Sequence, residues 1–186
     1  MSNHIIMMLI PSMYINLIDF FSLNATEVGL IFGIVSFCFG VGSLPMSFLY
    51  NKYGPKKLIA FSQVGITISA LLVSTSNSVL MFSFSSILLG LFASIHHPVS
   101  LTLISETFEK NIAKANAFHG VFGSIGVSLG PLISYFALLN YSWHYAFIFT
   151  AILNAFLIPL SLKSVSYTHL RAHETSLHLV CRLLLE

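Results

Sequence analysis

Two adjacent histidines and a proline interrupt the apolar stretch LLGLFASIHHPVSLTLIS, residues 88–105. Imidazole groups can bind a metal ion, and they can also exchange protons near neutral pH. Adjacent side chains on a regular helix point about 100° apart, so His96 and His97 cannot hold one ion together. Because no third ligand lies nearby in the sequence, we expect no metal site here.

Pro98 adds an irregularity to the same stretch. Proline lacks the backbone N–H and disfavours helical geometry at the residue before it, here His97. We therefore predict a kink or a break of the helix and a freed carbonyl near residue 94. At such a kink, His96 and His97 can line a solute pathway, or one of them can simply bond to a neighbouring helix.

The composition indicates that these residues lie in a lipid bilayer. Hydrophobic residues make up 56% of the 186-residue chain and charged residues 8%, with a net charge of +2. Soluble domains carry roughly 25% charged residues, so this chain has too few to cover a soluble core. The small net charge provides no basic patch for nucleic acid, and the two cysteines, Cys38 and Cys181, form no disulfide framework or zinc spacing.

Six apolar stretches of about 20 residues are long enough to cross a bilayer as helices. We therefore predict an all-α, polytopic membrane protein, with a six-helix transmembrane bundle in residues 1–164. The first stretch has neither the basic region nor the cleavage site of a signal peptide. The predicted spans are roughly 4–21, 27–50, 58–74, 79–105, 115–138 and 143–162.

The lysines give these spans an orientation. Every lysine lies in the second loop, in the fourth loop or after the sixth span, whereas the first, third and fifth loops have no Lys or Arg. Because positive residues mark the cytoplasmic side, we predict that both ends of the six-helix unit face the cytoplasm.

Ionisable groups inside a membrane are costly and are therefore the first candidates for function. No Asp or Glu lies deep in a predicted span, so we do not predict a proton relay through paired carboxylates. No Lys or Arg lies there either, which favours a neutral or amphipathic solute, or one whose charge is met by residues outside this six-helix unit. His119, near the cytoplasmic start of the fifth span, is expected to make a packing or gating contact. The candidate pathway-lining residues are His96, His97, His119, Tyr14 and Asn16, and the other ionisable groups in or near the spans are His4, Asp19 and His144.

Small residues recur on three of the spans at the spacing of one helix face, where they allow helices to approach closely in lipid. Two such stripes on the fifth span predict contacts on two sides, as for a central helix. The stripes are Gly29, Gly33, Ser36 and Gly40 in the second span, Ser86, Gly90 and Ser94 in the fourth, and Gly120, Ser124 and Ser128 with Gly126, Gly130 and Ser134 in the fifth.

The last 22 residues differ in composition from the rest, because they contain both arginines and three of the eight histidines. The segment SYTHLRAHET resembles a translated sequencing adapter. We therefore expect residues 165–186 to be a non-native or disordered tail, and the alternative is a genuine cytoplasmic tail.

The second loop, SFLYNKYGPKKLIAF, resembles the signature loop between the second and third helices of the major facilitator superfamily. That pattern reads roughly Gly-x-Leu-x-Asp-Arg-x-Gly-Arg-Lys, and this chain keeps the leucine, the second glycine and two basic positions. Asn51 replaces the acid and Pro55 an arginine. Gly54 also suits a tight turn with positive φ, whatever the family. The resemblance implies a gating loop made of Leu49, Asn51, Lys52, Gly54, Lys56 and Lys57.

Three further stretches resemble bacterial members of this superfamily. GLFASIHHPVSL and NAFHGVFGSIGVSLGP resemble their fourth and fifth helices, and SWHYAFIFTAILN resembles the start of the sixth. Part of an antiporter motif is present in the fifth, without its trailing glycine pair. The resemblance covers roughly residues 4–162 and implies packing or kink positions at Pro98, Gly126, Gly130 and Pro131.

The resemblance implies a secondary transporter that moves a small solute by alternating access, with a proton as partner if transport is proton-coupled. A full member has twelve helices in two halves, with the substrate site between them at the midplane. We therefore expect a truncated N-terminal half whose partners are the C-terminal half and the lipid of a bacterial inner membrane. No nucleotide-binding loop, cofactor motif or catalytic constellation is present, so we predict no cofactor and no enzyme activity. The alternatives are a membrane-embedded enzyme and a non-transporting subunit.

Overall fold

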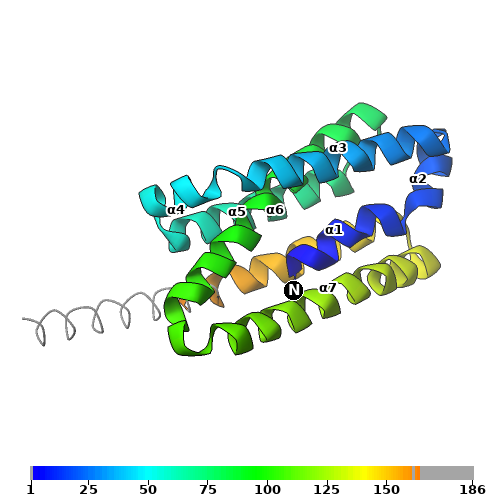
Figure 1. The fold of residues 1–186 in the computed structure, drawn as a ribbon. Helices are drawn as coiled ribbons and strands as arrows, with labels where there is room; N and C mark the ends of the chain where they lie inside the picture. Colours follow the sequence, from blue (N-terminus) through cyan, green and yellow to red (C-terminus); the bar gives the residue numbers. More distant parts are fainter. Residues whose placement is uncertain (1, 161, 164–186) are drawn as a thin grey trace, which may run out of the picture.

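The computed structural model describes residues 2–160, 162 and 163, which form a bundle of helices joined by short loops (Figure 1). No strand occurs among these residues, which confirms the all-α class. The predicted tail, residues 165–186, lies outside the described residues. The helices are α1 (Ser2–Ser12), α2 (Tyr14–Phe21), α3 (Ala25–Ser43), α4 (Met46–Tyr53), α5 (Pro55–Ser74), α6 (Val79–Thr107), the 3-10 helix η1 (Glu109–Asn111), α7 (Ile112–Asn140) and a last helix, Trp143–Leu160.

The described residues contain five helices that are long and apolar enough to cross a membrane, and six if the bent pair α1–α2 counts as one span. The five are α3, α5, α6, the segment Glu109–Asn140 and the helix Trp143–Leu160. The six-span prediction is therefore confirmed in order, and in number when the bent pair counts as one span. The first two spans differ from their predicted form, and prolines explain both differences.

The first span is not the single straight helix that we predicted over residues 4–21. The chain bends by 55° between α1 and α2. Pro11 lies inside α1 and has no N–H to donate to the carbonyl of Met7 one turn earlier. The backbone N–H of Met13 is shared between the carbonyls of Leu9 (3.1 Å) and Ile10 (3.2 Å), where the helix ends.

The second span is shorter than the predicted 27–50, because α3 ends at Ser43 and α4 starts at Met46 as a separate helix. Pro45 cannot donate to a carbonyl in the preceding turn. At the other end of α3, Asn24 and Glu27 form a capping box, in which each side chain accepts a hydrogen bond from the other residue's backbone N–H. This cap gives the span a defined start.

Pro98 does not break α6, which runs as one helix from Val79 to Thr107. The prediction of a break is wrong, and a kink at this position stays a prediction. Neighbours of Pro98 along the helix, Ser94, Ile95 and Val99, are all buried against other helices. This packing holds the chain helical on both sides of the proline.

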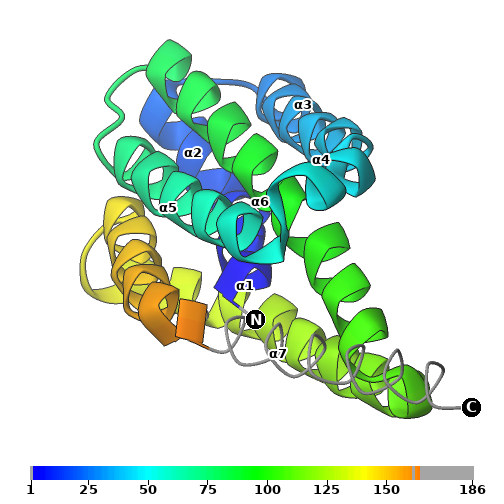
Figure 2. The same cartoon turned by 90° about the vertical axis from the view of Figure 1, so that its left-hand side faces the viewer.

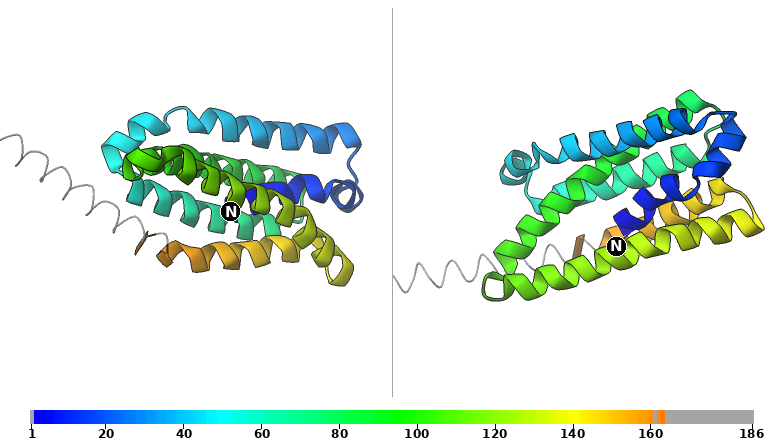
Figure 3. Two further views of the ribbon diagram at one scale, coloured as in Figure 1. Left: turned by 60° about the horizontal axis from the view of Figure 1, so that its bottom comes forward. Right: turned by 45° about the vertical axis from the view of Figure 1, so that its right-hand side comes forward.

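The core of the bundle lies around α1. Ile5, Ile6, Leu9 and Ile10 are each at most 1% exposed. Figure 2, which looks toward one end of the bundle, shows α1 with α5, α6 and α7 around it. In Figure 1 and in the right-hand view of Figure 3, α3, α5 and α6 form one group of helices, and α1 lies beside α7.

Small residues mark two of the closest contacts between helices. A Cβ atom on Gly90 would lie 2.8 Å from the carbonyl oxygen of Val35, so α6 approaches the α3 backbone there. A Cβ atom on Gly130 would lie 2.5 Å from Cβ of Met8, so α7 approaches α1 equally closely. The glycines of the predicted stripe in the second span do not lie at such a contact. A Cβ atom on Gly29, Gly33 or Gly40 would meet no atom within 4 Å among the described residues.

Candidate functional site: a pocket lined by histidines

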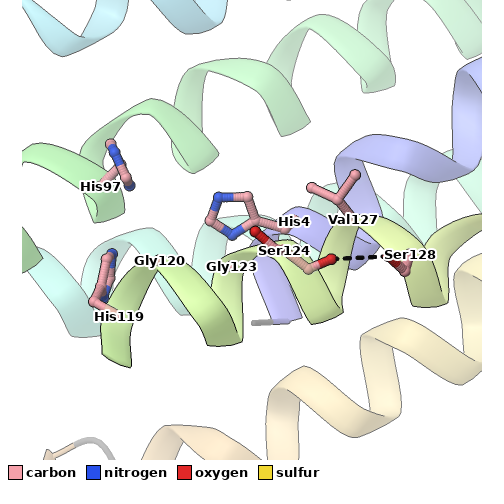
Figure 4. Close-up of a pocket in the computed structure, with 8 residues that line it drawn as sticks. All are labelled: His4, His97, His119, Gly120, Gly123, Ser124, Val127 and Ser128. Carbon is pink, nitrogen blue, oxygen red and sulfur yellow. Dashed lines mark hydrogen bonds between the residues drawn. The ribbon is translucent and has the colours of Figure 1, made fainter. Parts of the chain in front are cut away.

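Three imidazole rings from helices far apart in the sequence lie next to one another. His4 comes from α1, His97 from α6 and His119 from α7 (Figure 4). The ring centroids of His4 and His97 are 6.0 Å apart in an edge-on arrangement, and those of His97 and His119 are 5.6 Å apart. The three rings therefore form one cluster, which we call the histidine cluster.

The histidine cluster lines a cavity of about 340 Å³ together with small residues of α7. Gly120, Gly123, Ser124 and Ser128 leave space where larger side chains would fill it. A Cβ atom on Gly123 would lie 3.4 Å from Cε1 of His4, so this part of α7 is close to the rings. One predicted stripe of the fifth span thus lines a pocket.

A second cavity, of about 300 Å³, adjoins the first, because His4 and His97 line both. We call it the apolar pocket. Its polar lining consists of Asn3, His4, Ser36, His96 and His97. The rest of its lining comes from α1, α3 and α6 and is made of Met7, Met8, Phe32, Phe39 and Ala93.

Several polar atoms around the two pockets are buried and have no hydrogen-bond partner among the described residues. They are Nδ1 of His4 and His96, Nε2 of His119, and both side-chain atoms of Asn3. Buried polar atoms in proteins are nearly always paired, so unpaired ones at a pocket call for an explanation. A bound solute or water can supply the missing partner.

Apart from the histidines, the two pockets have an uncharged lining among the described residues. None of the described residues that line either cavity is Asp, Glu, Lys or Arg. The described residues also contain no group of three or more His, Cys, Asp or Glu side chains that could hold a metal ion. The histidine cluster is therefore suited to hydrogen bonding and proton exchange.

The structure brings some of the predicted pathway residues together and leaves others apart. His96, His97 and His119 lie at the two pockets, and His4, which the sequence marked only as an ionisable group in a span, joins them. Tyr14 and Asn16 line neither pocket. Tyr14 donates a hydrogen bond to the carbonyl of Ala25, and the Asn16 side chain is exposed.

The residues of the predicted antiporter motif lie on α7 at its contact with α1. Gly126 and Gly130 are buried, and the carbonyl oxygen of Ile5 would lie 3.0 Å from a Cβ atom on Gly130. Pro131 is exposed and lies inside α7 without ending it. Gly130 therefore allows α1 and α7 to pack closely against each other.

The loop that resembles the family signature has the turn that its sequence predicts. Gly54 has a φ of +77°, which glycine adopts without strain, and Pro55 is the first residue of α5. Leu49 is half-buried against neighbouring helices. Four other residues of the predicted gating loop have exposed side chains, namely Asn51, Lys52, Lys56 and Lys57.

Tyr50, which sequence reasoning did not single out, ties this loop to α6. Its hydroxyl donates a hydrogen bond of 2.5 Å to a carboxylate oxygen of Glu106, at the end of α6. Burial, together with this hydrogen bond and the negative charge of Glu106, raises the pKa of Tyr50 above its usual value. Tyr50 therefore stays protonated and keeps donating across the physiological pH range.

Asn154 is a second residue that sequence reasoning missed. Its side-chain nitrogen donates to the carbonyl of Gln63 (2.9 Å) and to the hydroxyl of Thr67 (2.8 Å), and its oxygen accepts from the hydroxyl of Ser2 (3.2 Å). These bonds join α1, α5 and the last helix inside the bundle. The signal in the sequence is an amide within an apolar span, ILNAF.

Comparison with known proteins gives consistent matches. The model of the Major Facilitator Superfamily matches residues 1–176. A probable L-galactonate transporter of Escherichia coli (strain K12) is 24% identical over 136 residues, which cover 73% of this chain and 30% of that protein. A probable nitrate transporter NarT of Staphylococcus aureus (strain bovine RF122 / ET3-1) is 25% identical over 141 residues, covering 73% and 35%. The class H tetracycline resistance protein of Pasteurella multocida is 33% identical over 116 residues, covering 61% and 28%. The chain thus spans about a third of the length of these relatives.

Proposed function

Because this chain belongs to the major facilitator superfamily, we propose that it forms one six-helix half of a secondary transporter that moves a small solute by alternating access. The family is one of transporters, which are typically not enzymes, and the chain is an integral membrane protein with several spans. The observation that carries the proposal is the pair of adjoining pockets between α1, α3, α6 and α7. In this proposal, the histidine cluster and His96 form one wall of the solute pathway.

The names of similar proteins support transport and do not agree on one solute. They include transporters of L-galactonate and of nitrate, and a tetracycline resistance protein. We therefore propose a small solute as the class, with a proton as its coupled partner. The histidines are the titratable groups that line the pockets in the described part of the chain, and this supports the proton.

We further propose that the loop between α4 and α5 takes part in gating. The turn at Gly54 holds Lys52, Lys56 and Lys57 at one end of the bundle, where the lysines are exposed. Asn51 can accept a hydrogen bond but cannot form an ion pair, so any contact across the two halves would depend on the lysines. The hydrogen bond from Tyr50 to Glu106 supports this role, because it ties α4 to the end of α6.

The experiment starts from the DNA that follows codon 164 in the genome that encodes this chain. We expect it to encode, in the same frame, six further apolar spans that complete the twelve-helix unit. The 186-residue chain and the complete product are then reconstituted separately in liposomes. Uptake of L-galactonate, nitrate and tetracycline is measured with and without a pH gradient.

We expect flux of at least one solute through the complete product and none through the 186-residue chain alone, because half of the pathway wall is absent. Flux through the chain alone would contradict the proposal and indicate that two copies form a complete transporter. A stop codon directly after codon 164, with no flux, would equally contradict it and favour a non-transporting subunit.

A further inference from the structure

We propose that the two adjoining pockets bind an amphipathic anion, with its charged group at the histidine cluster and its apolar part in the apolar pocket. This inference deepens the proposed function, on which it rests, because it names the class of solute. The sequence alone favoured a neutral or amphipathic solute, since no Lys or Arg lies deep in the spans. The arrangement of three imidazoles around one cavity changes that expectation for the charged group.

The histidine cluster has the donors that an anion requires. Nδ1 of His4 and Nε2 of His119 are buried and unpartnered among the described residues, and His97 is exposed between them. A protonated imidazole needs a negative partner when it is removed from water. The described lining contains no carboxylate to supply one, so the anionic group of a solute would fill that role.

The apolar pocket has the lining that an alkyl or aromatic group requires. Its apolar residues are Phe32 and Phe39 of α3, Met7 and Met8 of α1, and Ala93 of α6. Methionine side chains are flexible and adapt to irregular apolar groups. Because His4 and His97 line both pockets, one solute can occupy the apolar pocket and reach the cluster at the same time.

Anion binding and imidazole protonation must favour each other, because linkage between two bound ligands is reciprocal. The titratable groups that face the pockets are His4 from α1, His96 and His97 from α6, and His119 from α7. The described lining residues of α3 are Phe32, Ser36 and Phe39, which do not titrate. The α-amino group belongs to residue 1, outside the described residues. Anion affinity should therefore rise as the pH falls through the range in which histidine titrates.

The test measures binding to the full 186-residue chain in lipid nanodiscs, with empty nanodiscs as the baseline. The probe is radiolabelled 1-octanesulfonate, which stays ionised throughout, and the neutral comparison is octanamide. We expect the sulfonate to bind about tenfold more tightly at about pH 6 than at about pH 8, because the anion favours proton binding to the imidazoles and this binding increases as the pH falls. Octanamide should bind with the same affinity at both pH values.

Histidine variants assign the effect to the cluster. In the triple variant His4→Gln/His97→Gln/His119→Gln, the affinity for the sulfonate should no longer depend on pH. In His97→Gln alone, which changes an exposed side chain, the pH dependence of the affinity should become smaller. His144→Gln is the matched control, because His144 lines neither pocket and its ring stacks on that of Trp143, with the ring centroids 3.8 Å apart. Its binding should match that of the unmodified chain.

Three results would overturn the proposal: no sulfonate binding above the baseline, equal binding at both pH values, or a pH dependence that survives in both His97→Gln and the triple variant. None of these measurements involves flux. Binding without flux through the complete product would therefore contradict the proposed function alone. Flux without sulfonate binding would contradict only the assignment of the solute class.

Discussion

Asn154 shows how one amide can join three helices inside an apolar bundle. Its three hydrogen bonds reach Ser2, Gln63 and Thr67, and its side chain is 1% exposed. In a membrane, leucine packs against lipid as well as it packs against another leucine, so hydrogen bonds and close contacts hold helices together. Such bonds contribute about 0.6 kcal/mol each on average, with the strongest near 1.7 kcal/mol.

We therefore expect Asn154→Leu to lower the free energy of unfolding by about 1–2 kcal/mol, because Leu keeps the branched shape of the side chain and removes all three bonds. Unfolding of the chain in mixed micelles, followed by circular dichroism during titration with a denaturing detergent, measures the change. Asn140→Leu is the matched control, since Asn140 is exposed and, among the described residues, its side chain bonds to the carbonyl of Phe136 in its own helix. Equal losses in the two variants would contradict a linking role for Asn154.

The sequence predicted some residues of the site, for a physical reason that also limits the prediction. His96, His97 and His119 stand out because ionisable side chains are rare in apolar spans. Their convergence with His4 depends on how α1, α6 and α7 are rotated against one another, which no single span reveals. Asn154 and Tyr50 depend in the same way on partners 87 and 56 residues away in the chain.

At the scale of the helices, three prolines in apolar spans have three different effects on the helix. At Pro11 the helix ends soon afterwards and the first span bends, and at Pro45 a new helix begins. At Pro98 the helix continues. The local rule, that proline removes one donor, holds at all three positions. The packing of the flanking residues decides whether the helix survives, and a sequence pattern does not contain that information.

The close contact between α1 and α7 depends on one glycine. We expect Gly130→Ala to lower the free energy of unfolding by about 1–3 kcal/mol, because its Cβ would overlap Met8 and press on the backbone of Ile5. Gly120→Ala on the same helix is the control. A Cβ there meets nothing within 4 Å, so alanine should be neutral or stabilising by up to about 1 kcal/mol.

Thermal unfolding of both glycine variants, carried out in one and the same detergent, measures the difference in their stability. Since α1 carries His4, the Gly130→Ala variant should also disturb the histidine cluster, which is seen as a shift of the His119 side-chain signals in NMR spectra. If Gly130→Ala were as stable as Gly120→Ala, the close approach of α1 and α7 would not be a determinant of the fold.

For the whole molecule, composition and loops alone predicted an all-helical bundle with six spans, because the length of an apolar run fixes a span without any knowledge of its neighbours. Lysines lie in or beside two connections, the one between α4 and α5 and the one between α6 and α7, and both connections lie at the same end of the bundle (Figure 1). The loops that follow α2 and α5 lie at the opposite end and carry no Lys or Arg. The asymmetry of charge in the sequence thus becomes an asymmetry between the two ends of the molecule.

This asymmetry predicts the orientation of the chain in the membrane. Two exposed asparagines mark the two ends, Asn51 in α4 beside the lysines and Asn77 in the loop between α5 and α6. In a chain whose Cys38 and Cys181 are replaced by serine, Asn77→Cys should react in intact cells with a maleimide that cannot cross the membrane. Asn51→Cys should react only after the cells are permeabilised, because positive loops stay in the cytoplasm. Both substitutions leave every lysine in place, so neither changes the charges that set the orientation. Labelling of Asn51→Cys in intact cells would contradict the predicted orientation and would place the lysines around the α4–α5 turn outside the cell.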